Sequence, residues 1–302
     1  MTVRRLLRVN GPLMAMALPG VLFLLVFNYL PMGGLLIAFK DYRYSDGIFG
    51  SPWAGLDNFK FLFASQDAWR ITYNTLTLNL YFIVVGTVVS IGLALAMNEL
   101  RSKRFHTAVQ SAMFLPYLLS WVLVGYFVYA LLTTNGLMNR LLVWMRLEPI
   151  SWYSSPEYWP LILVLLSVWK GAGYTSIIYL ASIMGINPEY YEAATIDGAG
   201  RWKQIRYITL PLIRPVIIMM TLLALGKIFY SDFGMFYNVT RNAGALYSTT
   251  DVIDTYVFRM FRTVGDIGMS SAAGFYQAVI GFALVLLSNY AVRKLDKENA
   301  MF

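Results

Sequence analysis

The sequence contains no cysteine and a single histidine, His106. Without cysteine the chain can form neither a disulfide framework nor a thiolate metal site. A histidine-based metal site or catalytic triad is not expected either. His106 stands beside Arg101, Lys103 and Arg104 in a short basic loop, where a solvated role is expected.

Charge is also scarce: charged residues are 13% of the chain and hydrophobic residues 58%. Soluble domains have roughly a quarter charged residues. Several apolar stretches are long enough, at about 20 residues, to cross a bilayer as helices. We therefore predict an all-α polytopic membrane protein, with residues 1–302 forming a single domain.

Motifs for catalysis are missing as well. The sequence has no GxxxxGK[ST] loop, no GxSxG elbow and no HExxH pair, so it lacks the common nucleotide, nucleophile and zinc motifs. Asp251 and Asp254 are close in sequence, but their loop suggests solvated carboxylates. We predict no enzyme activity, no catalytic residue, no metal site and no cofactor in this chain. ATP and Mg²⁺, if used, would be bound by a partner.

Apolar runs predict six membrane spans, at residues 13–38, 75–97, 109–132, 160–184, 212–233 and 272–292. The first run is about twice the length of a signal-peptide core of roughly 7–15 residues, so an uncleaved helix is expected. Pro19-Gly20 and Pro31 are expected to bend this helix.

The net charge of +8 follows the pattern of membrane topology. With the N-terminus inside, the inner segments carry an excess of basic residues and the outer segments carry equal numbers of basic and acidic ones. This bias predicts that both termini are cytoplasmic. No basic stripe is interleaved with aromatic residues, so nucleic acid is not an expected partner.

Two lysines lie within predicted spans, Lys170 and Lys227. Charges inside a bilayer are costly and are functional by default. We hypothesise a substrate path that includes Lys170, Lys227, Tyr230, Asp232, Trp169 and Tyr174. Alternatively, each lysine bonds backbone or hydroxyl groups within the bundle or snorkels. Asp232 could be solvated near the outer end, and the aromatic rings could pack against helices or lipid.

Residues 187–210 form the only long polar interlude between two spans that has helix signals of its own. Asn187 can cap a helix whose first turn holds Pro188, and Asp197-Gly198 is a stop signal. A helix over 188–196 and a second helical piece over 201–208 are expected. An ordinary cytosolic turn is the alternative.

Residue identities in this hairpin add a resemblance. Glu192-Ala193-Ala194, Gly198, Ile208 and Leu210-Pro211 are similar, in type and spacing, to the EAA signature of bacterial ABC-importer permeases. In that family the first short helix is a coupling helix that docks on a separate ATPase. The resemblance implies that the ATPase-coupling residues are Glu189, Tyr190, Glu192, Ala193, Ala194, Asp197 and Gly198.

Longer segments resemble the LplB-type sugar permeases of the maltose-importer class. These segments are Phe27–Tyr42, Ser51–Phe59, Gly198–Pro211 and Ser248–Arg259. The resemblance implies a type I (MetI-like) ABC importer in a bacterial cytoplasmic membrane. Its partners would be a second permease, two ATPase subunits and an external solute-binding protein. The substrate would be an oligosaccharide, often an acidic one such as an aldouronate or alginate-like chain. A neutral-sugar permease, a secondary transporter and a non-transporting membrane assembly are the alternatives.

Overall fold

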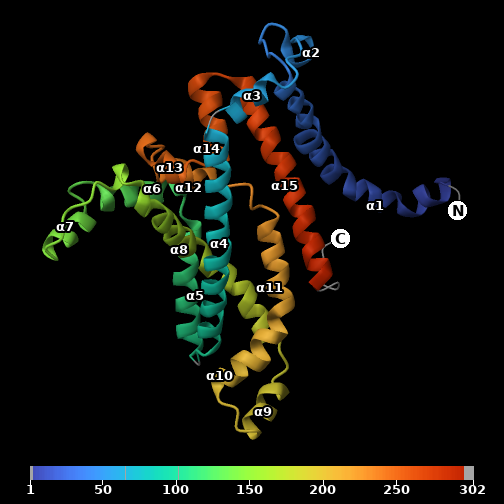
Figure 1. Cartoon of the computed structure of the whole chain (residues 1–302). Helices are drawn as coiled ribbons and strands as arrows, with labels where there is room; N and C mark the ends of the chain where they lie inside the picture. The colour runs from blue at the N-terminus through green and yellow to red at the C-terminus, as the bar shows by residue number, and fades with distance from the viewer. Residues whose placement is uncertain (1–2, 65, 101, 296–302) are drawn as a thin grey trace. The chain divides into compact units, whose positions relative to one another are not determined.

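The computed structural model describes residues 3–64, 66–100 and 102–295, which are mostly helical (Figure 1). The chain divides into two compact units. Unit 1 comprises residues 1–65 and 257–275, and unit 2 comprises residues 66–256 and 276–302. The unit boundary falls within two helices, α14 (Ile253–Arg259) and α15 (Ile267–Leu295).

Unit 1 begins with the first candidate membrane span, Leu13–Phe39, which confirms the first predicted span. Helix α1 (Val3–Leu24) continues through Pro19-Gly20, and the bend expected there stays a prediction. The helix type changes further on, to a π-helical turn at Leu25–Tyr29 and a 3-10 stretch at Leu30–Phe39 that contains Pro31.

After this span, unit 1 folds a short loop back on itself. The loop holds α2 (Gly47–Gly50) and α3 (Asp57–Ala64) and an isolated antiparallel bridge between Lys40 and Trp53. The Asn58 Nδ2 atom donates to the carbonyl oxygens of Ala38 and Lys40, both at 3.0 Å. A buried backbone turn thus obtains its hydrogen bonds from one side chain.

Unit 2 contains the remaining helices. They are α4 (Asp67–Asn98), α5 (Lys103–Leu118), α6 (Trp121–Leu132), α7 (Leu137–Trp144), α8 (Trp159–Met184), α9 (Glu189–Ile196), α10 (Arg201–Gln204), α11 (Leu210–Leu225), α12 (Phe233–Asn238) and α13 (Tyr247–Thr250), and the C-terminal part of α15. Over the described ranges, the candidate spans are Leu13–Phe39, Asp67–Asn98, Trp121–Trp144, Pro156–Met184, Arg201–Leu225 and Ile267–Tyr290. The predicted second, fourth and sixth spans are confirmed, although α4 and α15 begin earlier than expected.

The third predicted span, a single helix over 109–132, is wrong. The helix is interrupted between α5 and α6 at Leu119 and Ser120, whose backbone is extended with ψ angles of 136° and 149°. Ser120 caps the new helix, because its Oγ accepts the backbone N–H of Leu123 at 3.3 Å. Pro116 lies in the last turn of α5 and contributes no backbone N–H there.

The fifth predicted span, 212–233, is also too long. Helix α11 ends at Leu225, and residues 226–232 form turns and irregular backbone. Lys227, Tyr230 and Asp232 therefore lie beyond the helix.

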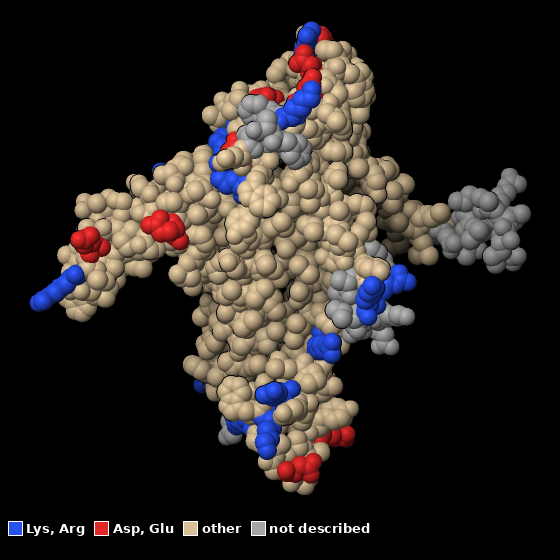
Figure 2. All heavy atoms as spheres, viewed as in Figure 1, with Lys and Arg blue, Asp and Glu red and all other residues tan. Residues whose placement is uncertain are grey.

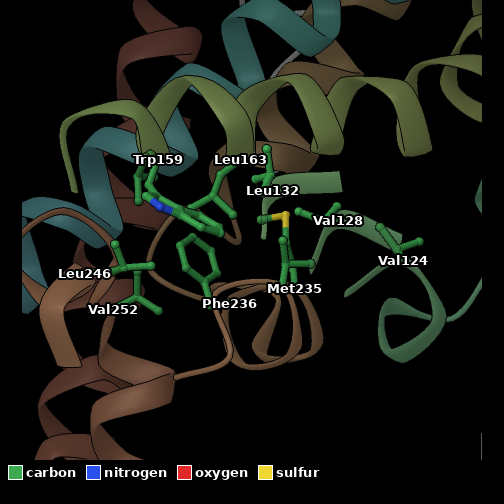
Figure 3. Close-up of a cluster of buried hydrophobic side chains, with 11 residues drawn as sticks. Val124, Val128, Leu132, Trp159, Leu163, Met235, Phe236, Leu246 and Val252 are labelled. Carbon is green, nitrogen blue, oxygen red and sulfur yellow. The ribbon is translucent and has the colours of Figure 1, made fainter. Parts of the chain in front are cut away.

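One buried hydrophobic cluster of unit 2 lies where α6, α8 and α12 meet (Figure 3). The side chains of Trp159 and Phe236 lie near each other with aliphatic side chains around them in this buried cluster. Along the spans, many large apolar side chains are exposed instead, among them Leu161, Leu165 and Phe282. In a membrane such surfaces face lipid, where burial against protein is not required.

Candidate functional site

The hairpin α9–α10 is stabilised by its own local bonds. The Asn187 Oδ1 atom accepts the N–H of Glu189 at 3.1 Å, as predicted for a capping residue. Gly198 has a φ of +75°, a value that an L side chain rarely adopts, so the predicted stop at Asp197-Gly198 is confirmed. The Tyr191 hydroxyl bonds the Thr209 hydroxyl at 2.9 Å and joins α9 to the start of α11.

Most of the hairpin's side chains are exposed. No residue of α9 is buried, and of the predicted coupling residues only Ala194 is half-buried. Three large apolar side chains stand in solvent, with exposed fractions of 87% for Ile196, 84% for Trp202 and 56% for Tyr190. Figure 2 shows acidic and basic residues gathered at the α9–α10 end, next to a largely uncharged surface. A protruding surface of this mixed kind fits a protein partner.

Helix α10 continues through a π-helical turn (Ile205–Thr209) into α11, so one helical segment extends from Arg201 to Leu225. At 1.5 Å per residue this segment is about 37 Å long. It leads directly from the hairpin to Lys227. The hairpin and the residues after α11 are therefore at the two ends of one helical segment.

Unit 2 holds a cavity of about 380 Å³, which we call the central cavity. Its walls come from α4, α8, α11 and residues 227–235, with Trp121 from α6. Lys227, Tyr230 and Asp232 are in its lining, as the path hypothesis requires. The Ser90 hydroxyl is buried in the same lining and has no hydrogen-bond partner among the described residues.

The irregular segment that carries Lys227 is fixed by side chains from distant elements. The Asn79 Nδ2 atom donates to the Ile228 carbonyl at 2.8 Å, and the Gln277 Nε2 atom donates to the Phe229 carbonyl at 2.8 Å. The Asp254 Oδ2 atom accepts the N–H of Ser231 at 2.8 Å. These bonds replace the helical ones that end at Leu225.

Asp232 has two partners, so it is not simply solvated. Its Oδ2 accepts the Trp121 indole N–H at 2.5 Å, and its Oδ1 accepts the N–H of Met235 at 3.2 Å. The carboxylate thereby caps α12 and joins α6 to α12 at the edge of the central cavity.

Lys170 does not line the central cavity, and its place in the substrate path stays a prediction. Its Nζ donates to the carbonyls of Tyr117 at 2.7 Å and Pro116 at 3.4 Å, at the end of α5. Because α5 ends at Leu118, the Lys170 ammonium group can act as a donor to these carbonyls; the Pro116 carbonyl also accepts the Leu119 N–H at 3.2 Å. The alternative reading, a backbone-bonded lysine, is the one observed.

Trp169 and Tyr174 are likewise outside the central cavity. Trp169 is 48% exposed and borders a separate, apolar hollow between α4, α5 and α8. Tyr174 stacks on Tyr117 with ring centroids 4.4 Å apart. Both aromatic residues pack against helices, as the alternative interpretation allowed.

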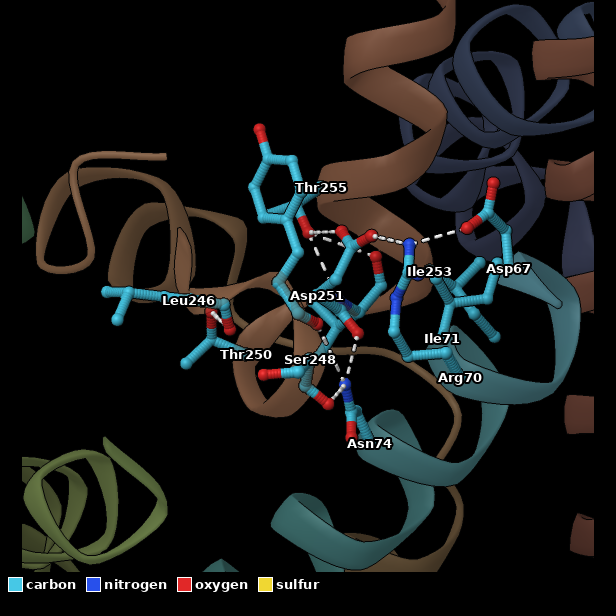
Figure 4. Close-up of polar contacts among 12 residues, drawn as sticks. Asp67, Arg70, Ile71, Asn74, Leu246, Ser248, Thr250, Asp251, Ile253 and Thr255 are labelled. Atoms are coloured by element: carbon cyan, nitrogen blue, oxygen red, sulfur yellow. Dashed lines mark hydrogen bonds and ion pairs between the residues drawn. The ribbon is translucent and has the colours of Figure 1, made fainter. Parts of the chain in front are cut away.

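Asp251 was expected to be solvated but is 1% exposed. Its Oδ2 lies 3.2 Å from the Arg70 guanidinium, which also contacts Asp67 at 2.6 Å (Figure 4). The Asn74 Nδ2 atom, from the same turns of α4, donates to the Asp251 carbonyl at 3.0 Å. Sequence reasoning missed this cluster, because no local pattern pairs residues 70–74 with residue 251.

A family profile described as "Binding-protein-dependent transport system inner membrane component" matches residues 86–297, more than half of the chain. The chain belongs to this permease family. Membership confirms the resemblance found in the hairpin and identifies a transport subunit rather than an enzyme. It decides against a secondary transporter and a non-transporting assembly.

Individual relatives align in sequence with nearly the whole length of this permease. Protein LplB of Bacillus subtilis (strain 168) is 36% identical over 93% of this chain and 88% of its own. The polygalacturonan/rhamnogalacturonan transport system permease protein YteP of the same organism is 37% identical over 94% and 88%. A crystal structure of a bacterial ABC transporter involved in the import of the acidic polysaccharide alginate has a chain with a TM-score of 0.88 and 36% identity, covering 97% of this permease and 99% of that chain.

Proposed function

We propose that this permease carries an acidic oligosaccharide into a bacterial cell, as one of two different permease chains above two ATPase subunits. An external binding protein delivers the sugar. The relatives support the substrate class: one is described as a permease for polygalacturonan and rhamnogalacturonan, and one belongs to a transporter for alginate. A further structure of the alginate transporter contains a periplasmic protein with bound alginate pentasaccharide.

The observation that carries the proposal is the continuous segment Arg201–Leu225, with the exposed hairpin at one end and the central cavity at the other. ATP binding closes the partner ATPases and displaces α9 through Glu189, Glu192 and Ala193. The displacement passes along α11 and changes access to Lys227. The hairpin is cytoplasmic in this mechanism, as are both termini.

Sugar recognition is assigned to the central cavity. The Lys227 ammonium attracts a carboxylate, the Tyr230 ring offers an apolar face, and the buried Ser90 hydroxyl meets a sugar hydroxyl. The Asp232 carboxylate, in the same lining, repels a second carboxylate on the substrate. This repulsion favours the alternative that the permease carries a neutral sugar. Uptake of acidic and neutral oligosaccharides by the reconstituted wild-type complex distinguishes the two.

The coupling role is tested by Glu192→Lys in the full complex reconstituted in proteoliposomes. We expect ATP-driven uptake to fall at least about tenfold, a loss of about 1.4 kcal/mol in coupling, while the thermal stability of this permease stays unchanged. Glu148→Lys reverses an equally exposed charge outside the hairpin and should leave uptake intact. Normal uptake and complex assembly with Glu192→Lys would refute the coupling role.

A further inference from the structure

A second hollow, of about 240 Å³, lies against α6 and α12, each of which contributes one residue to the central cavity, Trp121 and Met235. We call it the Arg241 groove; its lining is Val122, Gly125, Tyr126, Tyr237, Asn238 and Arg241. In α6, Trp121 lines the central cavity and the next residue, Val122, lines the groove. The α6–α12 pair therefore separates two hollows in unit 2.

The floor of the groove is backbone. A Cβ atom added at Gly125 would lie 2.7 Å from the Asn238 carbonyl oxygen, so glycine is what allows α6 and α12 to touch. Tyrosines border this floor: Tyr126 is 65% exposed, and Tyr237 stacks on Phe233 with ring centroids 5.1 Å apart. Two phenol rings beside a polar floor match the apolar face and polar rim of a pyranose.

Arg241 is held in place by backbone and ring contacts. Arg241 and Asn242 have φ values of 55° and 49°, in the left-handed region that non-glycine residues rarely occupy. The Thr240 Oγ1 atom accepts the N–H of Asn242 at 3.2 Å and supports this turn. The guanidinium carbon lies 4.2 Å from the centroid of the Tyr129 ring. Strained backbone of this kind persists where the surroundings require it, which is common at binding sites.

No carboxylate among the described residues lies within 4.0 Å of the Arg241 guanidinium. Tyr153 is also near, but its hydroxyl donates to the Val239 carbonyl at 3.1 Å, and burial raises the pKa of Tyr153 to about 12. The Tyr153 phenol is thus neutral at physiological pH. The guanidinium is positioned by an aromatic ring and has no counter-ion from the described chain.

We propose that the Arg241 groove is a separate binding site for one carboxylated sugar unit of the transported oligosaccharide, reached before the central cavity. The guanidinium binds the sugar carboxylate through two parallel N–H donors, and Tyr126 and Tyr237 contact the ring. The inference rests on the proposed import of an acidic oligosaccharide and on the predicted topology, which places residues 234–271 outside.

The test measures uptake by the complete reconstituted transporter from a panel of carboxylated tetrasaccharides, tetragalacturonate and tetramannuronate among them. Each is compared with its carboxyl-reduced, neutral counterpart. For the best transported acid, Arg241→Gln should raise the KM about tenfold and leave the maximal rate within twofold. Arg241→Lys should restore part of the affinity. The KM for the neutral counterpart should not change.

A matched control separates binding from general charge attraction. Arg140 is exposed on α7, in another segment predicted to be external, and its Nε donates to the Asn135 carbonyl. Arg140→Gln removes the same charge and should leave the KM unchanged. If no acid in the panel is transported by the wild type, the proposed substrate class fails and the groove proposal fails with it.

Two outcomes would overturn the groove while the proposed function stands. One is an unchanged KM for the acid with Arg241→Gln. The other is an equal loss of acidic and neutral uptake together with weaker co-purification of the partner subunits, which would make the groove a subunit contact.

Discussion

Lys170 and Lys227 both stand beside an interrupted helix, but the two interruptions use their lysine differently. At the α5 break the Lys170 ammonium is 2.7 Å from the Tyr117 carbonyl and 5.3 Å from the Trp121 ring centroid. Its charge is engaged by backbone dipoles and an aromatic face. Such a lysine supports the fold.

At the end of α11 the backbone obtains its bonds from other side chains. Asn79, Asp254 and Gln277 bind the backbone of residues 228–231. The Lys227 side chain is therefore not needed to satisfy backbone groups, and it is exposed in the lining of the central cavity. A cation beside a helix end is therefore a ligand-binding candidate only after the nearby carbonyls that lack helical partners have been assigned other donors.

The largest effect is expected from Lys170→Met. The variant leaves two α5 carbonyls without their charged donor, which should lower the free energy of unfolding by about 2 kcal/mol. Thermal unfolding of the solubilised protein measures this loss. Uptake of acidic and neutral sugars should fall together. Lys170→Arg keeps donors at the break and should recover most of the stability. If Lys170→Met lost only the uptake of acidic sugars and kept a normal unfolding midpoint, Lys170 would instead be part of the substrate path.

A smaller and selective effect is expected from Lys227→Met. Removing the charge should raise the KM for an acidic oligosaccharide about tenfold, or about 1.4 kcal/mol, because the lysine faces a cavity rather than bulk solvent. Uptake of a neutral counterpart and the unfolding midpoint should change little. Equal losses for both sugars would show that Lys227 has no part in recognising charge.

The features predicted correctly from sequence are those set by local signals. The length of α8 follows from a continuous apolar run, and the α9–α10 hairpin follows from Asn187 and Gly198, whose effects act within one turn. The features missed are long-range. The break after Leu118 has a local cap in Ser120, but the Tyr117 carbonyl there accepts a hydrogen bond from Lys170, 53 positions away. The buried Asp251 is contacted by Arg70 and Asn74, 181 and 177 positions away.

Candidate site residues divide in the same way. The hairpin residues carry a signature with fixed spacing and were placed together on one exposed element. Span membership predicts the path residues; Lys227, Tyr230 and Asp232 line the central cavity and Lys170 does not, and their role in a substrate path stays a prediction. Helix ends decide which backbone groups need side-chain partners, and the ends of helices within apolar runs are difficult to place from sequence.

The α5–α6 break is tested by Ser120→Ala, which removes the cap of α6 and should cost about 1 kcal/mol of unfolding free energy. Ser155→Ala is a suitable control, because Ser155 precedes a 3-10 turn without a side-chain capping bond. Thermal unfolding of both variants gives the difference. An unchanged midpoint for Ser120→Ala would indicate that Lys170 alone stabilises the break.

The smallest effect is expected at Asp254, which supports the segment that carries Lys227. Burial raises the pKa of this carboxyl above its ordinary value of 3.8, so the folded chain binds the proton more tightly than the unfolded chain. The stability that Asp254 contributes is fully present below pH 3.8, its ordinary pKa. It is lost as the pH rises through the higher pKa of the folded chain. Asp254→Asn is neutral throughout and can still accept from Ser231 and Gln277.

We therefore expect the unfolding midpoint of Asp254→Asn to decline less than that of the wild type as the pH is raised from about 4 to 7. At pH 7 the variant should be at least as stable. Asp41→Asn, at an exposed pair with Arg43, controls for the loss of one carboxylate. A variant less stable at pH 7 with an unchanged pH slope would show that the carboxylate holds Ser231 better than an amide does, and that its hydrogen bonds outweigh the penalty of burial.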